Sequence, residues 1–246
     1  MNNSGQKGSA LFIILIAVAL FAALGYAVSN MMRGGSTNIG EETAALRADE
    51  IIEYGRKMRE AVQNIRISNN CTVTQISFEN ATVAGYTNAG APGDDTCNVF
   101  EQAGGGLTYI VPETRWLDSS FSGNASYGQM LFNGTVCVDT LPDGDYTTCL
   151  SDATDNEELT FFVPFVQQDV CLAINEKLGI TNPSGDAPED VDCSWGGKFT
   201  GSYADGGAIG NAVNELDGKL TGCYKQDAAC LAMPGSYHYY QVLVVR

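Results

Sequence analysis

Eight cysteines and one histidine are the side chains in this sequence with the greatest potential for chemistry. His238 lies in the segment Tyr-His-Tyr-Tyr, near the C-terminus. A catalytic histidine needs a nucleophile and an orienting acid beside it, and the sequence contains no nucleophile elbow or paired signature of that kind. We therefore expect His238 to be structural or on the surface, and we predict no catalytic residue and no enzymatic activity.

The cysteine pattern favours disulfides over a metal site. Zinc sites use closely spaced cysteine and histidine ligands, whereas this chain has no Cys-x-x-Cys pair. An even number of cysteines, all beyond residue 70, is typical of a chain that folds in an oxidising compartment, although some could remain buried free thiols. The candidate disulfide residues are Cys71, Cys97, Cys137, Cys149, Cys171, Cys193, Cys223 and Cys230.

Sequence alone leaves the connectivity of these cysteines open. A Cys137–Cys149 bond is favoured because its loop is short and rich in turn residues, and each bond should stabilise the fold by about 2–4 kcal/mol. Nearest-neighbour pairing would further give Cys71–Cys97, Cys171–Cys193 and Cys223–Cys230, the last of which closes a still smaller loop.

Two acidic clusters and a glycine run complete the candidate sites. Asp143 and Asp145 flank a glycine and could hold calcium, but the full EF-hand pattern is missing, so we expect no cofactor. Gly104–Gly106 lacks the lysine of a phosphate-binding loop and predicts a turn or a close backbone approach. The second cluster should be a solvated face or a helix entry, and it contains Asp152, Asp155, Glu157 and Glu158.

The N-terminal quarter of the chain predicts a long helical region. Residues 1–8 form a short leader, and residues 9–32 form an apolar stretch that is long enough to cross a hydrocarbon core. A soft joint at 33–37 should precede an amphipathic helix over 38–67, capped by Asn38. Alternatively, leader, apolar stretch and amphipathic helix form one long rod that is weakest at Gly34-Gly35. The apolar stripe of the amphipathic helix comprises Ala44, Ala48, Ile51, Gly55, Met58, Val62 and Ile65.

Residues 71–246 predict an acidic α+β head, built on an antiparallel sheet with at least one further helix. An Asn133-Gly134 turn should join two strands into a hairpin, and a helix should run from Pro164 to Leu178 and stop at Gly179. Other strands are expected at Leu107–Val111, Leu159–Val163 and Tyr237–Val245, with a loop at Ser184–Asp192. The net charge of −16 disfavours nucleic acid as a partner.

The apolar stretch and the cysteines together predict a location. Lys7 and Arg33 flank the stretch and favour a cytoplasmic N-terminus only slightly. Because all cysteines follow the stretch, we expect the head on the oxidising side. The sequence thus predicts a single-pass inner-membrane protein whose head is periplasmic or extracellular.

The layout resembles the type IV pilin superfamily, through Gln6-Lys7-Gly8 and the apolar run that begins Ser9-Ala10-Leu11-Phe12. The resemblance implies that a prepilin peptidase cleaves between Gly8 and Ser9, that Ser9 becomes the methylated N-terminus, and that subunits pack through this helix. The family's usual glutamate at the fifth mature position is replaced by Ile13, as in minor pilins and tip-type pseudopilins. We therefore expect a non-enzymatic subunit of a type IV pilus or secretion pseudopilus.

Three other readings of the N-terminus and the head stay open. A permanent signal-anchor would make the chain a tethered periplasmic binding module. Cleavage after Gly25-Tyr26-Ala27 would instead release a secreted protein. A secreted hydrolase with an unrecognised site is the most remote of the three.

Overall fold

The computed structural model describes residues 7–138, 149, 157–190, 195–210, 215–230 and 233–246. Within the first helix, side chains are described from Phe12 to Tyr26 and from Gly40 onward. The chain divides into two compact units, Met1–Thr43 and Ala44–Arg246.

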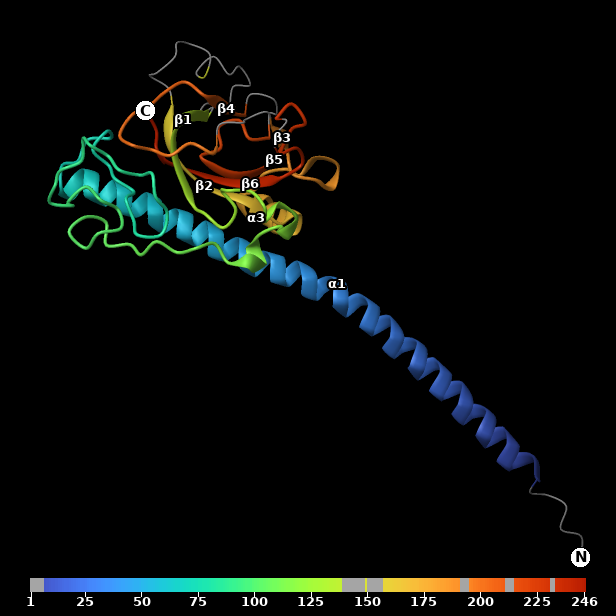
Figure 1. The fold of residues 1–246 in the computed structure, drawn as a ribbon. Coiled ribbons are helices and arrows are strands. Elements are labelled where there is room, and N and C mark those ends of the chain that lie inside the picture. Colours follow the sequence, from blue (N-terminus) through green and yellow to red (C-terminus); the bar gives the residue numbers. More distant parts are fainter. Residues whose placement is uncertain (1–6, 139–148, 150–156, 191–194, 211–214, 231–232) are drawn as a thin grey trace, which may run out of the picture. The chain divides into compact units, whose positions relative to one another are not determined.

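Helix α1 (Lys7–Ser68) continues without interruption through residues 33–37 (Figure 1). The predicted separate helix start, with its N-cap at Asn38, is therefore wrong, because a helix that is already formed has no free N-terminal amides at that point to cap. The continuous helix agrees with the alternative of one long rod, and the weakness expected at Gly34-Gly35 stays a prediction. The helix is followed by a left-handed residue: Asn70 has a positive φ of 55°, and the Cys71 amide beyond it donates to the Ile65 carbonyl at 3.4 Å.

The described residues of the second unit form one six-stranded mixed sheet (Figure 1). Its order is β3-β5-β6-β2-β1-β4; the central neighbours are antiparallel, while β4 pairs with β1 and β3 pairs with β5 in parallel. The strands are β1 (Leu131–Val138), β2 (Glu158–Val166), β3 (Glu189–Asp190), β4 (Gly207–Ile209), β5 (Thr221–Gln226) and β6 (Tyr237–Val244).

The fold-class prediction is wrong in two respects. The sheet is mixed rather than antiparallel, because two very short strands join its edges in parallel. The predicted long N-terminal helix, membrane-spanning and then amphipathic, is corrected as well, because α1 runs as one helix but no described helix could span a membrane.

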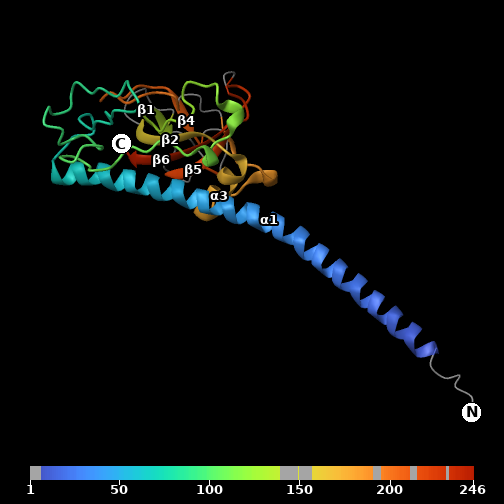
Figure 2. The same cartoon turned by 60° about the horizontal axis from the view of Figure 1, so that its bottom comes forward.

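Two apolar clusters lie on the two faces of the sheet. Along β2 the side chains alternate, so that Phe161 and Val163 join the cluster beneath α1, while Phe162 and Phe165 join the opposite cluster. The second half of α1 lies along its face of the sheet in both views (Figures 1 and 2). Every residue of the predicted stripe from Ala44 to Ile65 is buried, which confirms that stripe.

A glycine brings α1 close to the sheet. A Cβ atom at Gly55 would collide with the hydroxyl of Tyr239 on β6. About two turns further on, the Gln63 amide donates to the Leu243 carbonyl of the same strand at 2.8 Å. The Tyr54 ring tilts against Phe161 of β2, with centroids 5.9 Å apart. These contacts hold the helix close against β2 and β6.

The predicted hairpin at Asn133-Gly134 is a single strand with a bulge. The pairing of β1 with β2 shifts register between Asn133 and Val136. The Asn133 side chain accepts the Thr135 amide at 2.7 Å, and a Cβ atom at Gly134 would press on the ring of Phe199. The Asn-Gly pair therefore forms a β-bulge and leaves space for the ring of Phe199, and it does not form a turn that reverses the chain.

The predicted helix start at Pro164 is also wrong. Pro164 lies in β2 opposite His238, and Phe165 has a positive φ of 61° at a register shift. This bulge lets Phe165 and Val166 bury on opposite faces before α3 (Gln168–Leu178) begins. The predicted stop is confirmed, since Gly179 caps α3 in the left-handed conformation at φ 68°.

The remaining predictions for connecting segments hold in part. The last strand, β6, agrees closely with the predicted one, but Leu107–Val111 is not a strand. It is held instead by hydrogen bonds such as the one that the Met130 amide donates to Tyr109 Oη at 2.8 Å. The expected loop at 184–192 contains β3 and most of η3 (Pro183–Gly185); two further short turns are η1 (Thr114–Trp116) and η2 (Ser119–Phe121).

Candidate functional site

His238 lies in the interior, on the sheet face away from α1. Its ring stacks on Trp195 with centroids 4.5 Å apart, and its Nε2 atom lies 2.7 Å from Ser236 Oγ. Phe165 and Tyr224 complete the surrounding aromatic cluster. Within the described residues, Nδ1 has no hydrogen-bond partner.

Burial lowers the pKa of His238 to about 3, so the imidazole is neutral at physiological pH. Because the side chain is fully buried, it cannot reach a substrate in solution. Its burial agrees with the expected structural role.

Only two residues of the predicted acidic clusters are among the described residues. Asp143, Asp145, Asp152 and Asp155 lie outside the described residues. Glu157 and Glu158 are buried, so the expectation of a solvated face is wrong for these two. Glu158 begins the central strand β2 and Glu157 directly precedes it, where both sheet faces are covered. Among the residues that the structure describes, no group of three or more His, Cys, Asp or Glu side chains is placed to hold a metal ion.

Glu158 is held inside the fold by a backbone amide. Its Oε2 atom accepts the Val138 N–H of the neighbouring strand β1 at 2.7 Å. Burial is the main reason that its pKa rises to about 8, and the nearby charge of Glu157 adds to the rise, whereas Arg246 opposes it. Sequence reasoning missed this group, because an acid at the start of a strand is usually exposed.

The glycine run is a close-approach segment, as predicted. The Gly105 amide donates to the Asn98 carbonyl at 2.9 Å, and a Cβ atom there would press on the backbone of Val99. These contacts fill the space around the run, which leaves no cradle for a phosphate.

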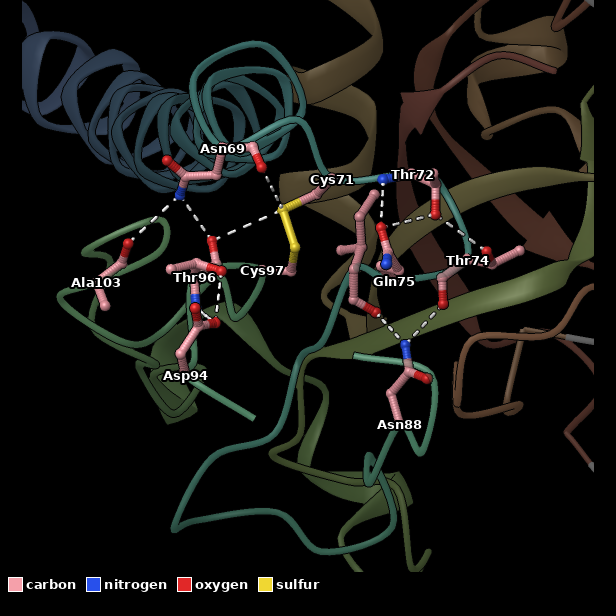
Figure 3. The surroundings of a disulfide bond; sticks show 11 residues. Asn69, Cys71, Thr72, Thr74, Gln75, Asn88, Asp94, Thr96, Cys97 and Ala103 are labelled. Carbon is pink, nitrogen blue, oxygen red and sulfur yellow. Dashed lines mark hydrogen bonds between the residues drawn. A yellow bond between two sulfur atoms is a disulfide. The ribbon is translucent and has the colours of Figure 1, made fainter. Parts of the chain in front are cut away.

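Two of the nearest-neighbour disulfides are present. Cys137–Cys149 is confirmed, and Cys71–Cys97 ties the end of α1 to the following loop (Figure 3). The Asn69 side chain supports this junction, because its amide donates to the Thr96 carbonyl at 2.7 Å.

The other predicted pairings are wrong, because Cys171 of α3 bonds to Cys223 of β5. The same two elements are joined by Asn175, whose side-chain amide pairs with both backbone groups of Cys223 at 2.9 Å. Helix α3 therefore lies against β5, which brings Cys171 to a cysteine far along the chain. Cys230 is also disulfide-bonded, while Cys193 lies outside the described residues.

The first unit carries a surface of another kind. Large apolar side chains of α1 are exposed to between 44% and 77%, and no charged residue interrupts them. We call these residues the apolar segment: Phe12, Ile13, Ile14, Leu15, Ile16, Val18, Leu20, Phe21, Leu24 and Tyr26.

The predicted membrane span over 9–32, and with it the single-pass inner-membrane location, is contradicted. In the part of the chain whose side chains are described, no helix combines the length and the apolar character that crossing a membrane requires.

The predicted processing site lies in the first turns of α1, where the backbone of Gly8 and Ser9 is helical and their side chains are not described. Cleavage between them stays a prediction. No protein-family model, curated protein or solved structure matches the chain.

Proposed function

We propose that the chain is a non-enzymatic, pilin-like subunit that assembles with copies of itself through the apolar segment. The observation that carries the proposal is the exposure of that segment. Contiguous apolar surface of this extent marks an interaction site in proteins that remain in water.

The distribution of apolar residues around the helix supports a bundle of several copies. Ile13, Ile14 and Leu15 follow one another along the chain and are each 63% exposed, so the helix is apolar on every side. A helix with a single apolar stripe needs one neighbour, but a helix that is apolar all round must be surrounded. Identical helices packed side by side would bury all of these faces at once.

The resemblance to pilins adds two parts to the proposal. A prepilin peptidase removes residues 1–8, and the new N-terminus at Ser9 then begins the packed helix. Ile13 replaces the family's usual glutamate, which in the family is thought to neutralise the N-terminal amine of a neighbouring subunit. A subunit without that carboxylate suits a tip or initiating position in a pilus or pseudopilus.

The second unit supports a structural rather than a catalytic role. Its one histidine is neutral and buried, and three disulfides link its described segments. Such cross-links stabilise a domain by restricting its unfolded state.

The test is to isolate the filament fraction from the source cells by shearing and ultracentrifugation, and to sequence the N-terminus of this chain by mass spectrometry. We expect the chain in the pellet, beginning at Ser9. A Gly8→Asn variant serves as the control, because it should keep the leader. A chain that stays in the supernatant, or that begins at Met1 or Val28, contradicts the proposal.

A further inference from the structure

Four asparagines among the described residues begin an Asn-x-Ser/Thr tripeptide, with x other than proline. This tripeptide is the acceptor for N-linked glycans in exported proteins. The four asparagines are Asn70, Asn80, Asn124 and Asn133. They differ in the exposure and the hydrogen bonding of their side-chain amides.

Three of these amides are already engaged in the fold. Asn80 donates to the Phe78 carbonyl at 2.9 Å and accepts two backbone amides. Asn124 donates to Met233 Sδ at 3.4 Å and accepts the Ser126 amide. Asn133 is only 1% exposed. A glycan on any of these would break local hydrogen bonds or bury a sugar.

Asn70 is the exception. Its backbone adopts the left-handed conformation that follows the end of α1. This role involves only the backbone and makes no demand on the side chain. The residue is exposed, and no hydrogen bond to its side chain is found among the described residues. The junction is held instead by its neighbours: Asn69 donates to the Thr96 carbonyl, and Cys71 is bonded to Cys97 (Figure 3).

We propose that Asn70 carries an N-linked glycan. In the transfer, Asn70 Nδ2 forms a bond to the anomeric carbon of a sugar that is carried on a polyprenyl diphosphate. The bond from that carbon to the diphosphate oxygen breaks, the polyprenyl diphosphate leaves, and one amide proton passes to solvent. No electron is gained or lost, and the amide keeps its other proton.

The surroundings of Asn70 fit this modification. The Cys71–Cys97 disulfide indicates that the segment matures in an oxidising compartment, as exported glycoproteins do. Thr72, which completes the tripeptide, is exposed as well, and its hydroxyl donates to Gln75 Oε1 at 3.0 Å. The inference does not rest on the filament proposal, since it concerns the second unit alone.

The test is peptide mass spectrometry of the chain purified from its source cells, after glycosidase release in ¹⁸O-labelled water. We expect labelled aspartate at position 70 and unlabelled asparagine at 80, 124 and 133. Label should be lost in Thr72→Ala and retained in Thr72→Ser, with the Cys71–Cys97 peptide intact in both variants. An unmodified Asn70 in the wild-type chain overturns the proposal, as does label at another asparagine in its place.

Discussion

Glu158 illustrates how a single residue can set the pH dependence of this fold. The carboxyl is neutral in the folded chain up to a pKa of about 8, but in the unfolded chain it ionises near its ordinary value of 4.5. Between these two values the folded state holds one more proton than the unfolded state. The contribution of Glu158 to the free energy of unfolding is therefore fully present below pH 4.5 and is lost as the pH rises through 8.

We expect the free energy of unfolding to fall by about 1–2 kcal/mol between pH 6.5 and 8 because of this residue. His238 acts in the opposite direction, because burial lowers its pKa from 6.5 to about 3 and its protonation in the unfolded chain therefore destabilises the fold as the pH falls toward 6.5. Comparison with Glu158→Gln separates the two effects, since that variant leaves His238 unchanged. Urea titrations between pH 6.5 and 8 should show a smaller fall in the free energy of unfolding for Glu158→Gln than for the wild type. The exposed control Glu60→Gln should behave as the wild type. An unchanged slope in Glu158→Gln would show that the carboxyl is not buried.

Sequence reasoning at the residue scale succeeded where one side chain has a single plausible role. A structural role for His238 could be predicted because the sequence shows no catalytic partners for it. A close backbone approach at the glycine run could be predicted because the run lacks the lysine of a phosphate-binding loop. Glu158 could not be found in this way, because its burial depends on β2 lying between two strands. That neighbourhood is a property of the sheet, not of the local sequence.

At the scale of elements, the packing of α1 on β6 rests on Gly55. Alanine normally favours a helix over glycine by about 1 kcal/mol, but here its methyl group would meet the Tyr239 hydroxyl. We expect Gly55→Ala to destabilise the second unit by about 1–3 kcal/mol, because overpacking outweighs helix propensity.

A double-mutant cycle can check the cause of that loss. Tyr239→Phe removes the oxygen that a Cβ atom would strike, so Gly55→Ala should cost less in that background. Thermal denaturation of the four proteins measures this coupling. Equal costs in both backgrounds would place the origin of the effect elsewhere.

Elements with a strong internal pattern were predictable, and those decided by tertiary contacts were not. The stripe from Ala44 to Ile65 repeats at helical spacing, so its buried face could be read from the sequence. Asn133-Gly134 reads equally as a turn or a bulge, and the ring of Phe199 decides between them. Pro164 similarly stays in β2, because Phe165 and Val166 gain burial on opposite faces.

At the scale of the whole molecule, the order of the strands and the Cys171–Cys223 bond lay beyond sequence reasoning. Both depend on contacts between distant segments, and the edge strands β3 and β4 are too short to carry a pattern. The exposed apolar segment, by contrast, follows directly from composition. We propose that copies of the chain bury this segment against one another, and this is the central claim.

Cross-linking between copies tests this claim most directly. A single cysteine is introduced by Ala19→Cys, within the apolar segment, and by Leu46→Cys, at a control position that is also exposed on α1. After mild oxidation of the assembled protein in its source cells, we expect covalent dimers for Ala19→Cys well above the level for Leu46→Cys. Monomers alone for Ala19→Cys, or equal dimers for both variants, would contradict assembly through this segment.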